Sequence, residues 1–413
     1  MIPRGKLDIG YKDLIRGLWY YWSSQPARVN APLTEGSDFL CLSVRTGFDL
    51  VLSALNLPAG AEILVTNVNI PGMFDIISAH KLKPVGLAVD RATLGLSAAQ
   101  IREAITTETR AILITHLFGA IMDIDEIVSV ARAKELLVIE DCAQAYAGNF
   151  YAGHDYSDVV MFSFGLIKTH TAVKGAVIKV RRPALLQQLV RLHAQYPVAS
   201  QREYAVRLIK AFFMKILVSR FLFTILYKLV TATGRDIDQV LGGLTRGFPG
   251  KNFLSQIRYQ PCLPNLKLLW YRMNRFNDRE ITLRVDLAKD LLADLPERYK
   301  VGGMNGRHTH WVMPVATDKP VTLIKLLRQH GFDATQKASS LITWQPEIRM
   351  TLSPDIRIAS QQDITEGDKS LILENLVYLP AYPAMSKKKR VELNQLLRSF
   401  YAVGLRGGRF EIS

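Results

Sequence analysis

An acid and a lysine in this sequence each follow an apolar run that is typical of a buried strand. Asp141 follows the run 136–139, and Lys168 follows the run 159–162. Since ligands bind at the carboxyl ends of the strands of an open α/β sheet, we expect both side chains at one rim. A lysine amine can form a Schiff base with a carbonyl, and a carboxylate can hold a protonated pyridine nitrogen. The pair therefore predicts a site for pyridoxal phosphate (PLP), with Lys168 and Asp141 as its catalytic residues.

Other residues lie where the same cofactor would need them. Gln144 could reach the hydroxyl of the pyridine ring, and His116, at the end of another expected strand, could lie near the ring. A phosphate needs backbone donors at a helix N-terminus and hydroxyls nearby. Thr46 and Gly47 open the first amphipathic helix, and Ser163 could supply a hydroxyl from the opposite side.

Each of these residues also has a purely structural interpretation. A strand-end acid such as Asp141 is a helix N-cap at least as often, and Gln144 would complete a capping box with it. A lone lysine in a loop is usually solvated, and a single histidine such as His116 is more often structural. Only the order and spacing of the whole set favour the cofactor site.

Helices and strands alternate through the part of the chain that holds these residues. We expect helices at 46–55, 75–80, 97–105 and 124–135, and strands at 62–65, 84–89, 111–115, 136–139 and 159–162. Strands separated by helices of this length form βαβ units, so the pattern predicts an α/β fold with a mostly parallel central sheet and helices on both faces.

The chain of 413 residues is too long for one ordinary core. We expect a large domain over 1–265 and a smaller C-terminal α+β domain over 266–413. The second domain should contain one helix over 266–295, a strand at 310–315, a helix at 321–331, a strand at 376–380 and a final helix.

The motifs together resemble the DegT/DnrJ/EryC1/StrS family of PLP-dependent aminotransferases. The segment Glu140-Asp141-Cys142-Ala143-Gln144 resembles the middle motif of the family, and Ser163-Phe164 with Lys168 resembles its Schiff-base motif. His116 and Gly119 match its His-x-x-Gly segment. The resemblance implies the PLP-dependent transferase fold of type I. It also implies that Lys168 is the Schiff-base lysine, Asp141 the partner of the pyridine nitrogen, Gln144 an O3′ contact and Ser163 a phosphate ligand.

The same resemblance implies an aminotransferase of amino sugar biosynthesis that works as a homodimer. The amino group would pass from an amino acid, L-glutamate as in relatives, to a keto or aldehyde acceptor. That acceptor would be a nucleotide-linked sugar or a lipid-linked, membrane-associated relative. Members with histidine in place of the lysine act as sugar dehydratases, so Lys168 indicates transamination. Two alternatives stay open: a non-transaminating PLP enzyme on the same fold, and a catalytically silent membrane-associated relative.

Three segments depart from the family pattern. The phosphate loop reads Arg45-Thr46-Gly47, and Arg45 would add a direct charge to the phosphate. Residues 67–74 lack the threonine followed by an aromatic residue that stacks on the pyridine ring in many members of the family. Arg258-Tyr259 is the only trace of the loop that enters the active site of the partner subunit. These departures predict an unusual amino acceptor.

Composition narrows the class of protein further. The net charge of +15 suits nucleic acid, an anionic membrane surface or an anionic substrate. Nucleic acid is not expected, because the sequence has no known binding motif, and the basic run 387–390 is interpreted as the solvated face of the final helix. The three cysteines have no metal-like spacing, so neither a metal site nor a disulfide framework is expected. No signal peptide is predicted, which indicates a cytoplasmic protein.

The segment 204–230 is unusually apolar and carries five basic residues. Its apolar runs are too short to span a bilayer. One interpretation is a pair of helices in a dimer interface. The other is a helix on an anionic membrane surface with snorkelling lysines, which would make the protein peripheral at the inner face of the membrane. The aromatic cluster 18–22 fits either an interfacial anchor or a buried arm.

Overall fold

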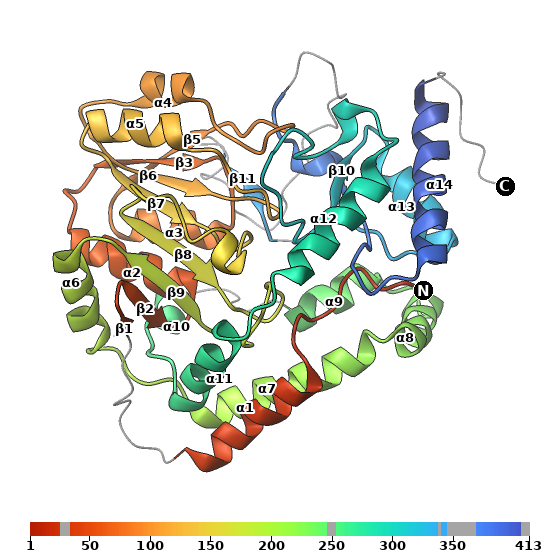
Figure 1. Ribbon diagram of the computed structural model, residues 1–413, viewed down its shortest axis with the longest axis horizontal. Coiled ribbons are helices and arrows are strands. Elements are labelled where there is room, and N and C mark those ends of the chain that lie inside the picture. Colours follow the sequence, from red (N-terminus) through yellow and green to blue (C-terminus); the bar gives the residue numbers. More distant parts are fainter. Residues whose placement is uncertain (25–33, 246–252, 338–339, 345–368, 406–413) are drawn as a thin grey trace.

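The computed structural model describes residues 1–24, 34–245, 253–337, 340–344 and 369–405. At its centre lies an eight-stranded sheet of order β1-β2-β9-β8-β7-β6-β3-β5 (Figure 1). The strands β3, β5, β6, β7 and β8 are parallel, and β9 is antiparallel to both β8 and β2. This confirms the mostly parallel sheet. The strands are β1 (Thr34–Glu35), β2 (Asp38–Cys41), β3 (Glu62–Thr66), β5 (Lys83–Leu87), β6 (Thr109–Thr115), β7 (Leu137–Asp141), β8 (Val159–Ser163) and β9 (Ala176–Val180).

Helices cover both faces of this sheet, because successive side chains of a strand point to opposite faces. In β6, Leu113 packs on one side while its neighbours Ile112 and Ile114 pack on the other. The first face is covered by α2 (Val44–Leu55), α3 (Pro71–Ala79) and α6 (Pro183–His193). The opposite face is covered by α4 (Ala98–Ala104), α5 (Asp125–Ala133), α1 (Tyr11–Ser23), α7 (Gln201–Leu217) and α11 (Leu263–Met273).

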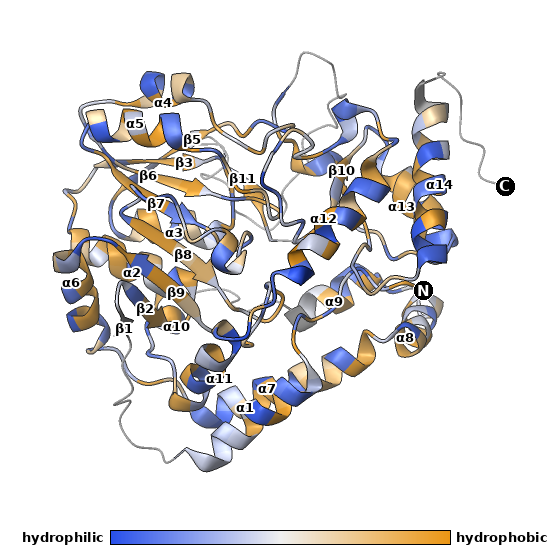
Figure 2. Ribbon diagram, in the orientation of Figure 1, coloured by the Kyte–Doolittle hydropathy of each residue, from blue (hydrophilic) through white to orange (hydrophobic). Residues whose placement is uncertain are grey.

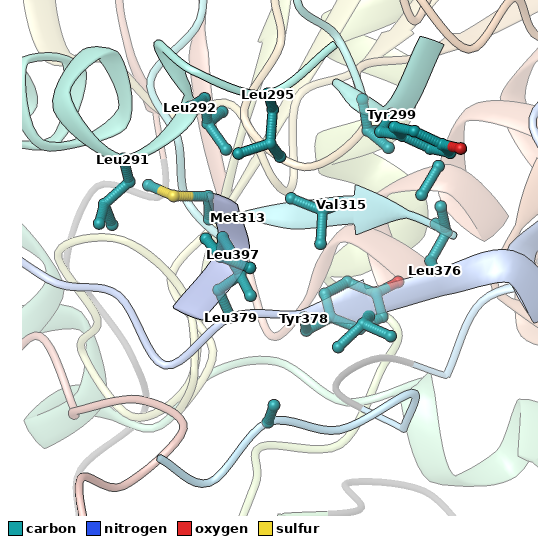
Figure 3. Close-up of a cluster of buried hydrophobic side chains, with 14 of the residues drawn as sticks. Leu291, Leu292, Leu295, Tyr299, Met313, Val315, Leu376, Tyr378, Leu379 and Leu397 are labelled. Carbon is teal, nitrogen blue, oxygen red and sulfur yellow. The ribbon is translucent and has the colours of Figure 1, made fainter. Parts of the chain in front are cut away.

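The C-terminal part of the chain builds a second core, shown in Figure 3. A two-stranded antiparallel ladder pairs Val315 with Val377. The ladder consists of β10 (Pro314–Ala316) and β12 (Leu376–Tyr378), and around it pack α12 (Arg279–Leu292), α13 (Pro320–Gln329) and α14 (Lys387–Leu405). Phe118, from the loop after β6, is buried in the same core. The domain boundary at residue 265 stays a prediction.

The N-terminal residues lie against this second core. The N–H of Ile2 donates to the carbonyl of Gly331 (2.7 Å), and the carbonyl of Ile2 accepts from the N–H of Asp333 (3.0 Å). Arg4 adds two hydrogen bonds to the buried carboxylate of Asp333 (2.8 and 2.9 Å). The arm before α1 is therefore fixed to the C-terminal part of the molecule.

Two elements differ from the prediction. The single helix expected over 266–295 is wrong, because the chain forms α11 and α12 with a break at residues 274–278. The side chain of Asn277 accepts from the N–H of Arg279, and this local bond starts the second helix. The strand expected at 310–315 is limited to Pro314–Ala316. His310 has a φ of +47°, which interrupts an extended chain.

The segment 204–230 forms two helices, α7 and α8 (Arg220–Ala232), and whether they face a partner subunit or a membrane surface stays a prediction. The shorter helices α9 (Ile237–Thr245) and α10 (Phe253–Ile257) follow. Figure 1 shows α1 and α7 running side by side along one edge of the molecule, and Figure 2 shows that α7 and α8 mix hydrophobic and hydrophilic residues. Among the described helices, none is long and apolar enough to cross a membrane.

Candidate active site

The N-terminus of α2 presents the sequence Arg45-Thr46-Gly47. Ser43 caps this helix, with its hydroxyl accepting from the N–H of Thr46 (3.2 Å). The Thr46 hydroxyl donates to the carbonyl of Ile257 (2.8 Å), so in this structure it ties α2 to α10. The first turn can therefore offer an anion the positive end of a helix and the charge of Arg45.

Gly47 has a packing role. A Cβ atom on Gly47 would lie 2.4 Å from Cδ1 of Ile178 in β9, so glycine lets α2 lie close against the sheet. Its N–H donates to the carbonyl of Ser43 (3.0 Å) and is thus used within the helix. The structure places Thr46 and Gly47 at the expected helix start, and it assigns both of them contacts that hold this helix in position.

Asp141 ends β7 at the same rim at which β6 and β8 end. In the parallel register it pairs with Thr115 on one side and Met161 on the other. Its carboxylate accepts from the N–H of Ala143 (2.9 Å). No helix follows β7 before the short 3-10 turn Gly148–Phe150, so the alternative in which Asp141 is a helix N-cap is wrong.

Lys168 lies in the turn after β8, where its N–H donates to the carbonyl of Gly165 (2.9 Å). Burial lowers the pKa of Lys168 to about 8, the charge of Arg45 acts in the same direction, and Asp141 opposes both. Burial raises the pKa of Asp141, and Lys168, His116 and Arg45 oppose that rise. Burial also lowers the pKa of Arg45 to about 10. The structure thus brings Arg45, Asp141 and Lys168 into one partly buried electrostatic cluster, in which Asp141 is the buried member.

Trp311 covers this cluster and was missed from the sequence. The Nζ of Lys168 lies 4.3 Å from the centroid of the Trp311 ring, a cation–π geometry. The indole Nε1 donates to the carbonyl of Ile167 (3.0 Å). The only sequence feature that could have indicated Trp311 was its place beside two histidines. Because residues 310–315 were predicted as a strand, this tryptophan was not considered as a site residue.

Gly119 makes room for the segment that carries Trp311. The N–H of Thr309 donates to the carbonyl of Gly119 (2.7 Å). Gly119 has a φ of +101°, and a Cβ atom there would lie 2.6 Å from the backbone N of Trp311. The glycine of the His-x-x-Gly motif therefore allows the loop after β6 to hold Trp311 over the lysine.

His116 forms hydrogen bonds that support the structural interpretation of this residue. Its Nδ1 accepts from the N–H of Met122 (2.9 Å), so its Nε2 carries the proton and donates to Glu140 (2.9 Å). Glu140 also accepts from the hydroxyl of Tyr151 and from the N–H of His154. Because both ring nitrogens are engaged, His116 can meet a cofactor only through the face of its ring.

The buried group formed by His116, Glu140 and Cys142 has the composition of a metal site. One ligand atom of each residue lies within 4.8 Å of the others. Hydrogen bonds already use the histidine and the glutamate, and burial raises the pKa of Cys142 well above its usual range. A neutral thiol is a poor metal ligand, so this group is better explained as a hydrogen-bonded support under the rim.

Gln144 and Ser163 lie at the same rim. The Oε1 of Gln144 accepts from the N–H of Phe118 (2.9 Å), which leaves its amide NH₂ as a donor. The Oγ of Ser163 accepts from the N–H of Gly165 (3.4 Å), and its own hydrogen can serve another acceptor. The capping box proposed for Gln144 is absent, since no helix starts at this point of the described chain.

The residues after Lys168 are held by the N-terminal arm. The N–H of His170 donates to Asp8 (2.8 Å). Arg284 from α12 bonds both to the hydroxyl of Thr169 (3.0 Å) and to Asp8 (2.9 Å). His170 itself has a φ of +55°, which a free loop would rarely adopt. Asp8 and Arg284 therefore fix the backbone that positions the lysine.

Residues 67–74, which depart from the family pattern, pack against a late segment of the chain. The short strand β11 (Ile342–Thr343) pairs with β4 (Val68–Asn69) beside β3. Trp344 stacks on Phe74 with ring centroids 4.6 Å apart. Asn69 donates to the hydroxyl of Thr115 at the end of β6 (2.8 Å). The aromatic contact with Lys168 therefore comes from Trp311, while Trp344 packs on Phe74.

Arg258 has an internal role in this structure. Its guanidinium forms two hydrogen bonds of 2.9 Å to Asp49 in α2. His80 and Tyr196 bond to the same buried carboxylate, each at 3.0 Å. The suggestion that Arg258 belongs to a loop reaching the partner subunit therefore has a competing explanation within one chain.

A cavity of about 640 Å³ lies between α12 and the segment 300–310. His308 and His310 line it, with their rings stacked at 3.8 Å. Burial lowers the pKa of both, and that of His310 falls to about 4. Both imidazoles are thus neutral at physiological pH. A ligand in this cavity would touch the residue next to Trp311.

The fold is that of the PLP-dependent transferases of type I. Residues 41–212 match the model of the DegT/DnrJ/EryC1/StrS aminotransferase family, which confirms the family resemblance found in the sequence. This segment contains Arg45, Asp141 and Lys168.

Similarities to individual proteins point to the same family. The chain is 30% identical over 158 residues to GDP-perosamine synthase from Escherichia coli O157:H7, a match that covers 38% of this chain and 43% of that relative. The whole fold resembles Helicobacter pylori PseC, an aminotransferase involved in pseudoaminic acid biosynthesis (TM-score 0.64, 12% identity, 97% and 99% of the two chains). It also resembles NtdA from Bacillus subtilis with bound PMP (TM-score 0.57, 16% identity, 96% and 80%). At these identities, the structural matches establish the fold.

Proposed function

We propose that this protein is a PLP-dependent aminotransferase. The observation that carries the proposal is the partly buried cluster in which Lys168 and Asp141, at the carboxyl ends of parallel strands, meet Arg45 from the start of α2, with Trp311 over the lysine. The match of residues 41–212 to an aminotransferase family supports it, because all three charged residues lie within that segment.

The charges of the cluster fit the cofactor group by group. The raised pKa of Asp141 means that the neighbouring cations do not fully compensate the buried carboxylate, and a protonated pyridine nitrogen would supply the missing charge. Lys168, with a pKa of about 8, has an accessible neutral form that can attack an aldehyde. The N-terminus of α2, Arg45 and the Ser163 hydroxyl would hold the phosphate.

In this mechanism the residues of the chain bind, orient and move a proton. Bound PLP supplies an electron sink that stabilises negative charge at the α-carbon of the substrate. The Nζ of Lys168, once neutral and free, would accept the proton from that carbon and, as general acid, would deliver it to C4′ of the cofactor. Asp141 keeps the ring nitrogen protonated, and Trp311 excludes water above the amine.

The similarity to known proteins supports a proposal for the amino donor and the amino acceptor. We propose L-glutamate as the amino donor and a keto sugar on a nucleotide carrier as the acceptor, which the similarity to GDP-perosamine synthase supports. A lipid-linked acceptor is the second candidate, since exposed aromatic side chains on α1, α7 and α8 favour work at the inner face of a membrane. A homodimer is proposed from the family resemblance.

Absorbance spectra of the purified protein test the activity. With PLP added, we expect a band near ~410–430 nm from the lysine adduct, and L-glutamate should abolish it. Lys168→Ala should remove the band. Lys174→Ala is the matched control, because Lys174 is also a partly buried lysine with a pKa of about 8. A protein without the band would refute the proposal. A band that persists with every amino donor would favour a non-transaminating or silent relative.

A further inference from the structure

Three helices carry a second apolar stripe on their solvent side. In α1 the exposed residues 11, 15, 19 and 22 follow helical spacing, and α8 repeats the pattern at 221, 225 and 229. Trp22 is 76% exposed, Phe221 75% and Phe213 64%. We call the ten residues the apolar face: Tyr11, Ile15, Trp19, Trp22, Val206, Ile209, Phe213, Phe221, Ile225 and Leu229.

The apolar face is distinct from the residues that pack these helices into the core. Leu14 and Gly17 of α1 are buried, and a Cβ atom on Gly17 would lie 2.9 Å from Leu208 of α7. Phe223 is the buried residue of α8. One stripe is enough to hold a surface helix to its protein. A second stripe of large apolar side chains, shared by neighbouring helices, is typical of an interaction surface.

The charged residues of the same helices are nearly all basic. In the described residues of α1, α7 and α8, Glu203 is the one exposed acid, and Asp13 is half-buried and bonded to Arg272 (2.7 Å). The exposed cations are Lys12, Arg16, Arg202, Lys210, Arg220 and Lys228. A partner of this face must therefore offer both an apolar surface and negative charges.

This charge pattern disfavours a second copy of the chain as the partner. A two-fold interface places the same patch against itself, which would bring these six cations against six others. An anionic bilayer satisfies both features. Tryptophan and tyrosine favour the boundary between headgroups and acyl chains, and lysine and arginine extend to the phosphates.

We propose that the apolar face docks the protein on an anionic lipid bilayer, with α1, α7 and α8 lying at the membrane surface. The apolar side chains enter the acyl boundary, and the cations contact anionic headgroups. The proposal rests on exposure and charge, so it holds or fails independently of the aminotransferase activity.

Flotation of the full-length protein with vesicles tests the proposal. We expect it to float with phosphatidylcholine vesicles containing 30% phosphatidylglycerol at low salt. The protein should remain in the bottom fraction with pure phosphatidylcholine, which has no net charge. It should remain there at high salt as well, because salt screens the attraction between surface charges. The triple variant Trp22→Ser, Phe213→Ser, Phe221→Ser should bind at least tenfold more weakly. Lys210→Glu with Lys228→Glu should weaken binding to the anionic vesicles.

The matched control is Met304→Ser, Val321→Ser, Val391→Ser, which removes three exposed apolar side chains outside the apolar face and should float like the wild type. Circular dichroism checks that each variant is folded. A wild-type protein that never floats would overturn the proposal, and so would a folded apolar-face variant that floats equally well. If that variant instead changes the oligomeric state measured by light scattering while no form floats, the face is a protein interface. The PLP spectrum of the same sample tests the activity separately.

Discussion

Trp311 holds its indole ring over the Nζ of Lys168, 4.3 Å from the ring centroid. An aromatic face stabilises the ammonium form of a lysine by about 0.5–2 kcal/mol, which corresponds to about 0.4–1.5 pKa units. This contact therefore opposes the burial that lowers the pKa of Lys168 to about 8. It also joins the two halves of the sequence at the reacting amine.

Trp311→Leu should lower the pKa of Lys168, because leucine keeps the apolar cover and removes the aromatic face. The pH dependence of PLP incorporation, followed by absorbance, should shift its midpoint downward by about 0.4–1.5 units. Trp311→Phe should shift it less. The exposed Trp19→Leu is the control. An unchanged midpoint in Trp311→Leu would show that the contact does not act on the amine.

Asp141→Asn should abolish transamination while stabilising the cofactor-free protein at neutral pH. Burial raises the pKa of Asp141 in the folded state, so the ionised group costs stability at pH values above its unfolded pKa of about 3.9. The asparagine can still accept from Ala143. Urea unfolding from pH 4 to 8 should show a gain for the variant that grows as the pH rises. A constant difference would contradict the assignment.

Asp49→Asn should destabilise the protein by about 3 kcal/mol, since it leaves Arg258 facing a neutral group and weakens the bonds from His80 and Tyr196. The contacts hold the folded pKa of Asp49 at about 2, so its contribution is present above the unfolded pKa of about 3.9 and is lost as the pH falls toward 2. Unfolding curves at pH 2.5 and 7 measure this. The exposed Asp155→Asn should change little at either pH.

Gly119→Ala should detach Trp311 from Lys168, because the new Cβ atom would lie 2.6 Å from the backbone N of Trp311. Gly60→Ala is the matched control, with a φ of +86° and no atom within 4 Å of its Cβ position. Both variants pay the strain of a positive φ, about 1–3 kcal/mol, and only Gly119→Ala adds the clash. Quenching of tryptophan fluorescence by PLP should weaken in Gly119→Ala alone.

The sequence predicts the rim of the sheet better than its cover. Asp141 ends β7 and Lys168 lies in the turn that follows β8, so the sequence pattern places both near the rim at which parallel strands end. Trp311 bonds to a residue 144 positions away, and no local pattern encodes such a contact. Arg258 and Asp49 are 209 positions apart for the same reason.

Local chemistry also set the limits of the helix prediction. The apolar spacing continues across residues 274–278, but α11 ends at Met273 and the Asn277 side chain accepts a backbone bond at the start of α12. The role of His116 could not be derived either, because it depends on which groups its two nitrogens meet in the fold. A local side-chain bond decided the first case, and tertiary hydrogen bonds decided the second.

The pairing of the N-terminal arm with late parts of the chain has a consequence for synthesis. Ile2 is made about 330 residues before Gly331, its bonding partner, and Asp8 is made 276 residues before Arg284. At about 5–20 residues per second, the arm is synthesised roughly 20 to 60 s before the residues to which it bonds. During that time the loop that bears Lys168 lacks the hydrogen bonds from Arg284. Cofactor capture should therefore be a post-translational event, and a nascent chain stalled before residue 284 should not retain PLP.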